Sequence, residues 1–337
     1  MRSRVRLHRV AQHIAAAERR PGPPSSELDA GADAEHRHLS DFFEPETGPA
    51  IDTALAELDA RGYTVLRGMI DEAWLGELRQ RFDELCDEEG LLGGLETMPE
   101  ERQQELRASL LPGYEGEPPF AGIRRLGDLV NKGACFDRIW QNPTLISIVA
   151  GVLPAPFKLH SVNGHDPLPG QGRQNLHADW SPPPELQPRD PGLFGVVNSA
   201  WCLDEFTIEK GGTRLVPASH RVPGSTPSET ADDEAVQVAT PAGSVIIWCA
   251  NAQPTDNTVK LQISNELGVL GCRNGSTWHG GCVNTTQLKR RAVHCAWLDR
   301  RYNQQTNQRQ YLRYVTCSLS PCLIVAVQET DSVVLAS

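Results

Sequence analysis

The amino-acid sequence predicts a mainly β fold, either a sandwich or a barrel, preceded by a smaller helical part. From Phe157 onward, short β-type runs alternate with turn residues at close spacing, which is typical of such folds. Upstream, over 49–156, apolar residues recur at the spacing of amphipathic helices. A chain of 337 residues is long enough for one large domain or two ordinary ones, so its length excludes little.

Residues 1–48 are predicted to be a disordered leader or a targeting segment, because they are rich in Pro, Gly, Ala and Asp and lack a sustained apolar period. Two targeting patterns compete. The pair Arg6-Leu7, followed after five residues by His13-Ile14, resembles a bipartite peroxisomal signal. The arginines of the opening, with few acidic residues among them, resemble instead a mitochondrial transit peptide: Arg2, Arg4, Arg6, Arg9, Arg19 and Arg20.

The charge balance and the cysteines restrict the class of protein. Lys plus Arg total 32 against 43 Asp plus Glu, and the net charge of −11 disfavours sequence-independent binding to nucleic acid or anionic membranes. No apolar run approaches the roughly 18 residues of a membrane span. The 9 cysteines show no C-x-x-C pair, which favours reduced thiols. We therefore expect an intracellular, cytoplasmic protein with a small-molecule partner, unless the leader directs it to peroxisomes or mitochondria.

The helical part is predicted to begin near Pro49. Its clearest helix has Asp71 as N-cap, carries apolar residues on one face, and ends at Gly90. Most of 91–122 is rich in Gly, Pro and Glu and is expected to be loop. The other predicted elements are a helix with Ile51, Leu55 and Leu58 that ends at Gly62, a strand over Tyr63–Leu66, and two helices opened by proline, around Pro99–Leu110 and over Pro143–Val152.

The β half contains the residues with chemical potential. Its expected strands include Val196-Val197, Thr213–Val216, Val236–Val238, Ser244–Trp248 and Ala292–Leu298.

The strongest local signal is the H-x-D segment that contains His177 and Asp179. In a strand, alternate residues point to the same face, so these two side chains can share one metal ion. His279, in the segment Trp278-His279-Gly280-Gly281, offers a third ligand far downstream. Two histidines and one carboxylate on one side of a metal leave three positions open, the arrangement associated with Fe(II) oxygenases.

Other histidines and the tryptophans have competing interpretations. His220 is a rival ligand, but its position after a short strand favours a supporting role in a turn. His160 and His165 precede the H-x-D segment and are candidates for the pocket wall, although solvated or structural roles are favoured. Trp180, Trp201, Trp248 and Trp278 are expected in the core or in a pocket wall.

Further segments follow in a consistent order. Trp201–Phe206 precedes Gly211–His220, Pro241–Ser244 then opens a strand, and Arg290 stands eleven residues after His279. With these segments, residues 55–313 resemble the phytanoyl-CoA dioxygenase family of iron(II)/2-oxoglutarate-dependent oxygenases. The resemblance implies a double-stranded β-helix, a jelly-roll, cupin-like barrel with flanking helices. It implies one domain over 49–313, with a helical part at 49–156 and the jelly-roll core at 157–313.

The resemblance also implies roles for single residues. His177, Asp179 and His279 would hold Fe(II), and Arg290 would pair with the distal carboxylate of 2-oxoglutarate. Trp201 would lie near the co-substrate. Asn163, on the strand before the H-x-D segment, is a further candidate co-substrate contact. With O2, such an enzyme converts 2-oxoglutarate to succinate and CO2 while it hydroxylates or otherwise oxidises a C–H bond of a small substrate, of the acyl-CoA or secondary-metabolite type.

Three features depart from the family pattern. Residues 249–273 form an atypical insertion before His279, either a lid or interaction loop at the barrel mouth or a translated intron. Residues 314–337 form an atypical tail, and Gly281 stands where some relatives place a serine on the co-substrate. The insertion and the tail motivate an alternative function, a catalytically silent jelly-roll binding protein. A zinc-dependent hydrolase that uses the same ligand types is a second alternative.

Overall fold

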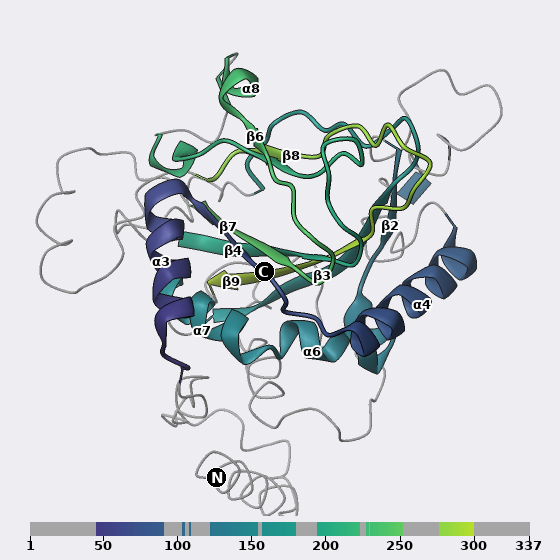
Figure 1. The fold of residues 1–337 in the computed structure, drawn as a ribbon, viewed down its shortest axis with the longest axis horizontal. Helices are drawn as coiled ribbons and strands as arrows, with labels where there is room; N and C mark the ends of the chain where they lie inside the picture. Colours follow the sequence, from purple (N-terminus) through teal and green to yellow (C-terminus); the bar gives the residue numbers. More distant parts are fainter. Residues whose placement is uncertain are drawn as a thin grey trace, which may run out of the picture.

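The structure, a computed structural model, describes residues 45–90, 122–153, 157–179, 194–222, 230–251 and 276–299, with a few residues between these segments. Two antiparallel sheets lie one above the other, and helices cover the outer face of the larger sheet (Figure 1). This layering buries apolar side chains on both faces of the larger sheet.

Capping residues set the ends of the two longest helices. In α4, which spans Glu72–Glu89, the Asp71 carboxylate accepts a hydrogen bond of 2.8 Å from the Trp74 N–H. In α3, which spans Pro49–Arg61, Gly62 ends the helix with φ of 83°, a left-handed conformation that favours glycine. The shorter helices are α6 (Asp137–Trp140), α7 (Pro143–Val152) and α8 (Ala231–Glu234), with 3-10 turns η3 (Leu129–Asn131), η4 (Ala134–Phe136) and η6 (Ser219–Arg221).

The larger sheet has the strand order β1-β7-β4-β9-β3-β2, and every neighbouring pair is antiparallel. The smaller sheet has the order β6-β5-β8. The strand bounds are β1 Tyr63–Leu66, β2 Ile123–Leu126, β3 Phe157–Pro167, β4 Phe194–Cys202, β5 Arg214–Leu215, β6 Val236–Gln237, β7 Val245–Asn251, β8 His279–Gly280 and β9 Ala292–Asp299. In Figure 1, α7, α6 and α4 lie below the larger sheet and the smaller sheet lies above it.

Side chains alternate between the two faces of the larger sheet, as the pleat requires. On β4, Val197 and Trp201 belong to the core under the helices, whereas Ala200 belongs to the core between the sheets. On β9, Val293, Cys295 and Trp297 likewise pack in the core under the helices. The inner face that remains, between the two sheets, is where a site can form.

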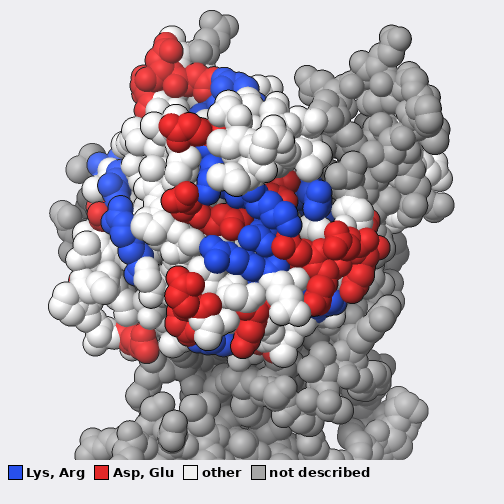
Figure 2. All heavy atoms as spheres, turned by 45° about the vertical axis from the view of Figure 1, so that its right-hand side comes forward, with Lys and Arg blue, Asp and Glu red and all other residues white. Residues whose placement is uncertain are grey.

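The described charges are interspersed on the surface. In the view of Figure 2, Lys and Arg side chains gather at the middle of one face with Asp and Glu side chains directly beside them. Ion pairs among the described residues include Arg291–Asp83 and Lys132–Glu89. None of the helices in the described part combines the length and apolar character needed to cross a bilayer. Six cysteines lie in the described part of the chain, and none of these six is in a disulfide.

The predicted fold class, mainly β with flanking helices, is confirmed. The predicted helices at 51–61, 72–89 and 143–152 are α3, α4 and α7, and each predicted strand run lies in β1, β4, β5, β6, β7 or β9. Strand β2 was not predicted. Among the described residues the strands form two facing sheets, consistent with a jelly roll, and not one closed barrel.

Several predictions fall outside the described residues. These are the helix around 99–110 except for isolated positions, the leader up to residue 44, most of the 249–273 insertion, and the 314–337 tail. The division of the chain into a leader, one domain over 49–313 and a tail therefore stays a prediction.

Candidate active site

Three side chains with metal-binding atoms meet on the inner face, between the two sheets. Nε2 of His279 lies 3.0 Å from Oδ2 of Asp179, and Nε2 of His177 lies 3.6 Å from Oδ1 of the same carboxylate. One donor atom from each residue falls within 4.8 Å of the other two. Neighbouring ligands on a metal with bonds near 2.1 Å stand about 3 Å apart, so this set is close to the required geometry.

The backbone brings the two distant histidines together. His177 and His279 form an isolated antiparallel bridge, in which each N–H donates to the other's carbonyl at 2.9 and 3.0 Å. His279 also belongs to β8, which pairs with β5 of the smaller sheet. The H-x-D segment is therefore extended, as predicted, but it contributes this one bridge and not a full strand.

The tautomers of both histidines suit metal binding. Nδ1 of His177 lies 2.8 Å from the Asn175 carbonyl oxygen, and Nδ1 of His279 lies 3.0 Å from the Thr277 carbonyl oxygen. A carbonyl oxygen only accepts, so each Nδ1 must carry the proton. Each Nε2 then faces Asp179: it donates to the carboxylate when the ring is charged, and it offers its lone pair to a metal once that proton is lost, which is how a ligating imidazole is normally oriented.

Asp179 is held by donors from the larger sheet. Its Oδ2 accepts a hydrogen bond of 2.6 Å from Nδ2 of Asn198 on β4 and a longer contact of 3.4 Å from the indole N–H of Trp248 on β7. Burial acts to raise the pKa of Asp179, but the charges and hydrogen bonds of His279 and His177 outweigh it and lower the pKa well below its ordinary value. The carboxylate is therefore ionised and ready to bind a cation.

These residues open into a cavity of about 310 Å³. Its floor is the inner face of the larger sheet, with Asn163 from β3, His294 from β9 and Arg125 from β2. Burial lowers the pKa of His294 to about 3 and that of His160 to about 4, so both wall imidazoles are neutral at physiological pH.

Arg290 lines the same cavity, and the described residues provide it with no ion-pair partner. The residue is 3% exposed, and its guanidinium lies over the ring of Phe206 at 4.7 Å. No described carboxylate forms an ion pair with it, and its Nε, buried, has no hydrogen-bond acceptor among the described residues. Burial lowers the pKa of Arg290 to about 10, which still leaves it cationic. A buried cation without a counter-ion is unfavourable, so the arrangement fits an anionic ligand.

The structure separates the remaining sequence candidates into two groups. Asn163, His160 and His165 line the cavity, although structural roles were favoured for the two histidines. Trp201 does not reach it: its indole packs edge-on against Trp74 of α4, with ring centroids 5.9 Å apart, on the helix side of the sheet. The expected contact of Trp201 with the co-substrate is therefore wrong.

His220 is fully buried in η6 and contacts the Asp59 carbonyl oxygen at 3.0 Å, away from the cavity. Trp180 lies outside the described residues.

Three residues of the site were missed from the sequence. Asn198 contacts Asp179 directly, and His294 stacks on His165 with ring centroids 4.2 Å apart. Arg125 extends the cavity wall from β2. One signal was available: His294 lies between Ala292 and Ala296 in the period of a strand, so a polar residue with small neighbours on the same face marks an inner surface.

Gly281 is explained by a close backbone approach. A Cβ atom at this position would lie 2.6 Å from the carbonyl oxygen of Gly172, a distance that real Cβ atoms essentially never show. The Gly281 N–H also donates to Oε1 of Gln174 at 3.1 Å, and the Gln174 N–H donates to the Gly281 carbonyl at the same distance. Serine cannot replace this glycine unless the 172–174 segment moves.

Comparisons with known proteins identify the family of the chain and solved structures with a similar fold. The family model described as phytanoyl-CoA dioxygenase (PhyH) matches residues 58–252, more than half of the chain. A curated relative, "Dioxygenase trt7" of Aspergillus terreus, is 22% identical over 205 residues, which cover 59% of this chain and 62% of the relative. The chain thus aligns with less than two thirds of that relative.

Solved structures share the fold. HygX from Streptomyces hygroscopicus with nickel and 2-oxoglutarate bound superposes with a TM-score of 0.50 and 15% identity, over 75% of this chain and 88% of HygX. The iron-bound form of HygX gives a TM-score of 0.50 with 14% identity, over 77% and 90% of the two chains. The extent of the family match then identifies the protein: the chain belongs to the phytanoyl-CoA dioxygenase family.

Proposed function

We propose that this protein is an Fe(II)- and 2-oxoglutarate-dependent dioxygenase that hydroxylates or otherwise oxidises a C–H bond of a small organic substrate. The observation that carries the proposal is the presence, in one cavity, of two histidines and a carboxylate at metal-binding distances and of a buried arginine that has no counter-ion among the described residues. The first set suits a metal with open coordination positions, and the arginine suits the carboxylate of a co-substrate.

Each residue has a separate part in this proposal. His177, Asp179 and His279 hold the metal, and the backbone carbonyls of Asn175 and Thr277 keep both imidazoles in the tautomer that binds it. Arg290 holds the distal carboxylate of 2-oxoglutarate with its guanidinium fork. When bound, Fe(II) with 2-oxoglutarate and O2 supplies the oxidation, in which the co-substrate becomes succinate and CO2.

The side chains of the cavity wall favour a substrate with hydrogen-bonding groups rather than a plain hydrocarbon chain. The described wall contains neutral imidazoles at His160, His165 and His294, the guanidinium of Arg125 and the amide of Asn163. A neutral imidazole offers one donor and one acceptor, so these side chains suit hydroxyl, amide or carboxyl groups. We propose that such groups lie near the oxidised carbon.

The test is anaerobic reconstitution of the purified protein with Fe(II), followed by addition of O2 and measurement of succinate formed from 2-oxoglutarate. We expect Asp179→Ala to abolish succinate formation and Fe(II) binding, whereas Asp87→Ala, at an exposed position of α4, should leave both unchanged. Calorimetric titration with 2-oxoglutarate separates the alternatives. A protein that binds neither Fe(II) nor 2-oxoglutarate would be a silent jelly-roll binding protein, and one that retains zinc without binding 2-oxoglutarate would support a hydrolase.

A further inference from the structure

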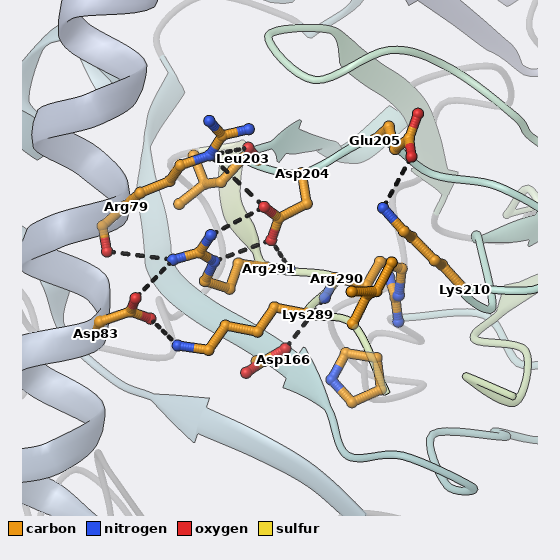
Figure 3. A network of polar contacts seen from close by, with 12 residues as sticks. Arg79, Asp83, Asp166, Leu203, Asp204, Glu205, Lys210, Lys289, Arg290 and Arg291 are labelled. Carbon is orange, nitrogen blue, oxygen red and sulfur yellow. Dashed lines mark hydrogen bonds and ion pairs between the residues drawn. The ribbon is translucent and has the colours of Figure 1, made fainter. Parts of the chain in front are cut away.

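A network of charged side chains surrounds the backbone beside Arg290 (Figure 3). Arg291 donates from Nε and Nη2 to the two carboxylate oxygens of Asp204, at 2.9 Å each. Its Nη1 donates to Asp83 on α4 at 2.8 Å, and Lys289 contacts the other oxygen of Asp83 at 2.7 Å. Arg291 is 8% exposed and lies directly before β9. Its buried charge is thus balanced by the carboxylates of Asp204 and Asp83.

The carboxylates of Asp204 and Asp166 accept hydrogen bonds from the backbone N–H groups of Arg291 and Arg290. The Arg291 N–H donates to Oδ2 of Asp204 at 2.9 Å, and the Arg290 N–H donates to Oδ1 of Asp166 on β3 at 3.3 Å. In return, the Leu203 N–H donates to the Arg291 carbonyl at 3.0 Å. The backbone that carries Arg290 is thus fixed by β3 and by the end of β4.

The two adjacent arginines have opposite surroundings. Arg291 takes both oxygens of Asp204, while the guanidinium of Arg290 has no carboxylate partner among the described residues. The negative charges of Asp166 and, less strongly, of Asp204 nevertheless act on Arg290 and favour its cationic form. Without the charge of Arg291, Asp204 would keep the hydrogen bond from the Arg291 backbone N–H, and its remaining described cation would be the half-buried Arg79 at 3.5 Å. Arg290 would then be a competing partner for a poorly solvated carboxylate.

We propose that Arg291 is a positioning residue for the co-substrate. Its guanidinium occupies the carboxylate of Asp204, which would otherwise compete with 2-oxoglutarate for the Arg290 guanidinium. The inference rests on the proposed function, in which Arg290 binds the distal carboxylate of 2-oxoglutarate.

A double-mutant cycle tests this inference, because Arg291→Gln and Asp204→Asn break the same ion pair but leave opposite charges behind. On Ni(II)-loaded protein, titrated with 2-oxoglutarate by calorimetry, Arg291→Gln should raise the Kd about tenfold or more, since it leaves the competing carboxylate. Asp204→Asn should change the Kd by less than about threefold, and the double variant should return to within about threefold of wild type. Ni(II) affinity, measured alongside, should be the same in all four proteins.

Asp83→Asn is the matched control. It removes the contacts of Asp83 with Arg291 and Lys289 but leaves Asp204 and the peptide hydrogen bonds in place. It should lower the Tm and leave the Kd for 2-oxoglutarate within about threefold of wild type, because Asp204 stays paired with Arg291. A merely structural network predicts instead that Kd follows Tm in every variant.

The outcomes are distinct. Equal increases of Kd in Arg291→Gln and Asp204→Asn, or a double variant no better than Arg291→Gln, would overturn the inference while the function stands. A wild-type protein that binds Ni(II) but not 2-oxoglutarate would overturn the proposed function and the inference with it. If Arg291→Gln does not fold, Arg291→Lys decides, because it keeps the charge: its Kd should stay near wild type, and a tenfold loss there contradicts the competing role of Asp204.

Discussion

At the scale of single residues, the candidate site depends on side chains that orient the metal ligands as much as on the ligands. Asp179 lies on an extended segment with one bridging residue, so the local backbone restrains it less than a full strand would. The hydrogen bond from Asn198 compensates for this, because Asn198 comes from β4 at the centre of the larger sheet. Partners of this kind commonly change metal affinity about 10–100-fold when they are removed.

We therefore expect Asn198→Ala to weaken Fe(II) binding by about 10–100-fold without unfolding the protein, because Asp179 loses its shortest donor. Anaerobic metal titration, with circular dichroism as a check of folding, measures this effect. Ser199→Ala is the control: Ser199 is the next residue on β4, and its hydroxyl donates to the Cys295 carbonyl oxygen. It should reduce stability and leave metal affinity unchanged. Equal metal affinity in Asn198→Ala and wild type would exclude the orienting role.

At the scale of elements, the packing of α4 against the larger sheet determines how the site is supported. Gly164 on β3 is the point of closest approach, since a Cβ atom there would lie 2.6 Å from the Phe82 ring and 3.1 Å from Leu126. The same helix carries Asp83, which reaches Arg291 beside the candidate co-substrate anchor. A shift of α4 would therefore affect both the core and the entry to β9.

Gly164→Ala should lower the free energy of unfolding by about 1–3 kcal/mol through overpacking, because Phe82 is fully buried and has little room to move. Phe82→Leu alone should also destabilise, since it leaves a cavity. The double variant should be more stable than the sum of the two losses predicts, because the smaller side chain accepts the added methyl group. Urea unfolding of the four proteins measures the coupling, and strict additivity would show that helix and strand do not meet as described.

At the scale of the whole molecule, the sequence predicts what depends on local chemistry and spacing. The Asp71 cap, the Gly62 break and the two-residue period of β4 and β9 are local signals, and the structure contains all of them. Strand β2 was missed because its sequence, Ile-Arg-Arg-Leu, is a four-residue edge strand with two cations between its apolar ends, so its apolar pattern is weak.

The site was predictable only in part, for a related reason. His177, Asp179 and His279 are brought together as their motifs suggested, because ligand types and strand order are written in the sequence. Side chains along β4 alternate between the two faces of the sheet, so the face on which Trp201 lies depends on the exact register of the strand. A shift of one residue would move Trp201 to the opposite face. The contacts of Asn198 and His294 depend on which strands become neighbours: in the order β4-β9-β3, His294 pairs with Asn163 and Ala200, which lie 131 and 94 positions earlier in the chain.

The buried neutral histidines of the cavity make the stability of the metal-free protein depend on pH. The folded pKa values of His160 and His294, about 4 and about 3, lie below the ordinary value of 6.5, mainly because of burial. Between pH 6.5 and about 4 the unfolded chain binds protons that the folded protein does not, so stability is greatest above this window and falls as the pH decreases through it. Each such proton contributes a slope of about 1.4 kcal/mol per pH unit.

His294→Gln should therefore reduce the slope of the unfolding free energy against pH, by an amount that corresponds to at most one proton taken up on unfolding. Urea unfolding of chelator-treated protein at several pH values from 7 to 4.5 measures this slope. Comparison with wild type isolates His294, because Asp166 and Asp137, whose pKa values burial raises, contribute equally to both proteins. Asn163→Ala, at the position paired with His294 across β3 and β9, removes a cavity side chain without a titrating group. It should change the stability but not the slope. An unchanged slope in His294→Gln would mean that His294 is protonated or solvated in the folded protein. His294 could then not be one of the neutral imidazoles proposed to contact the substrate.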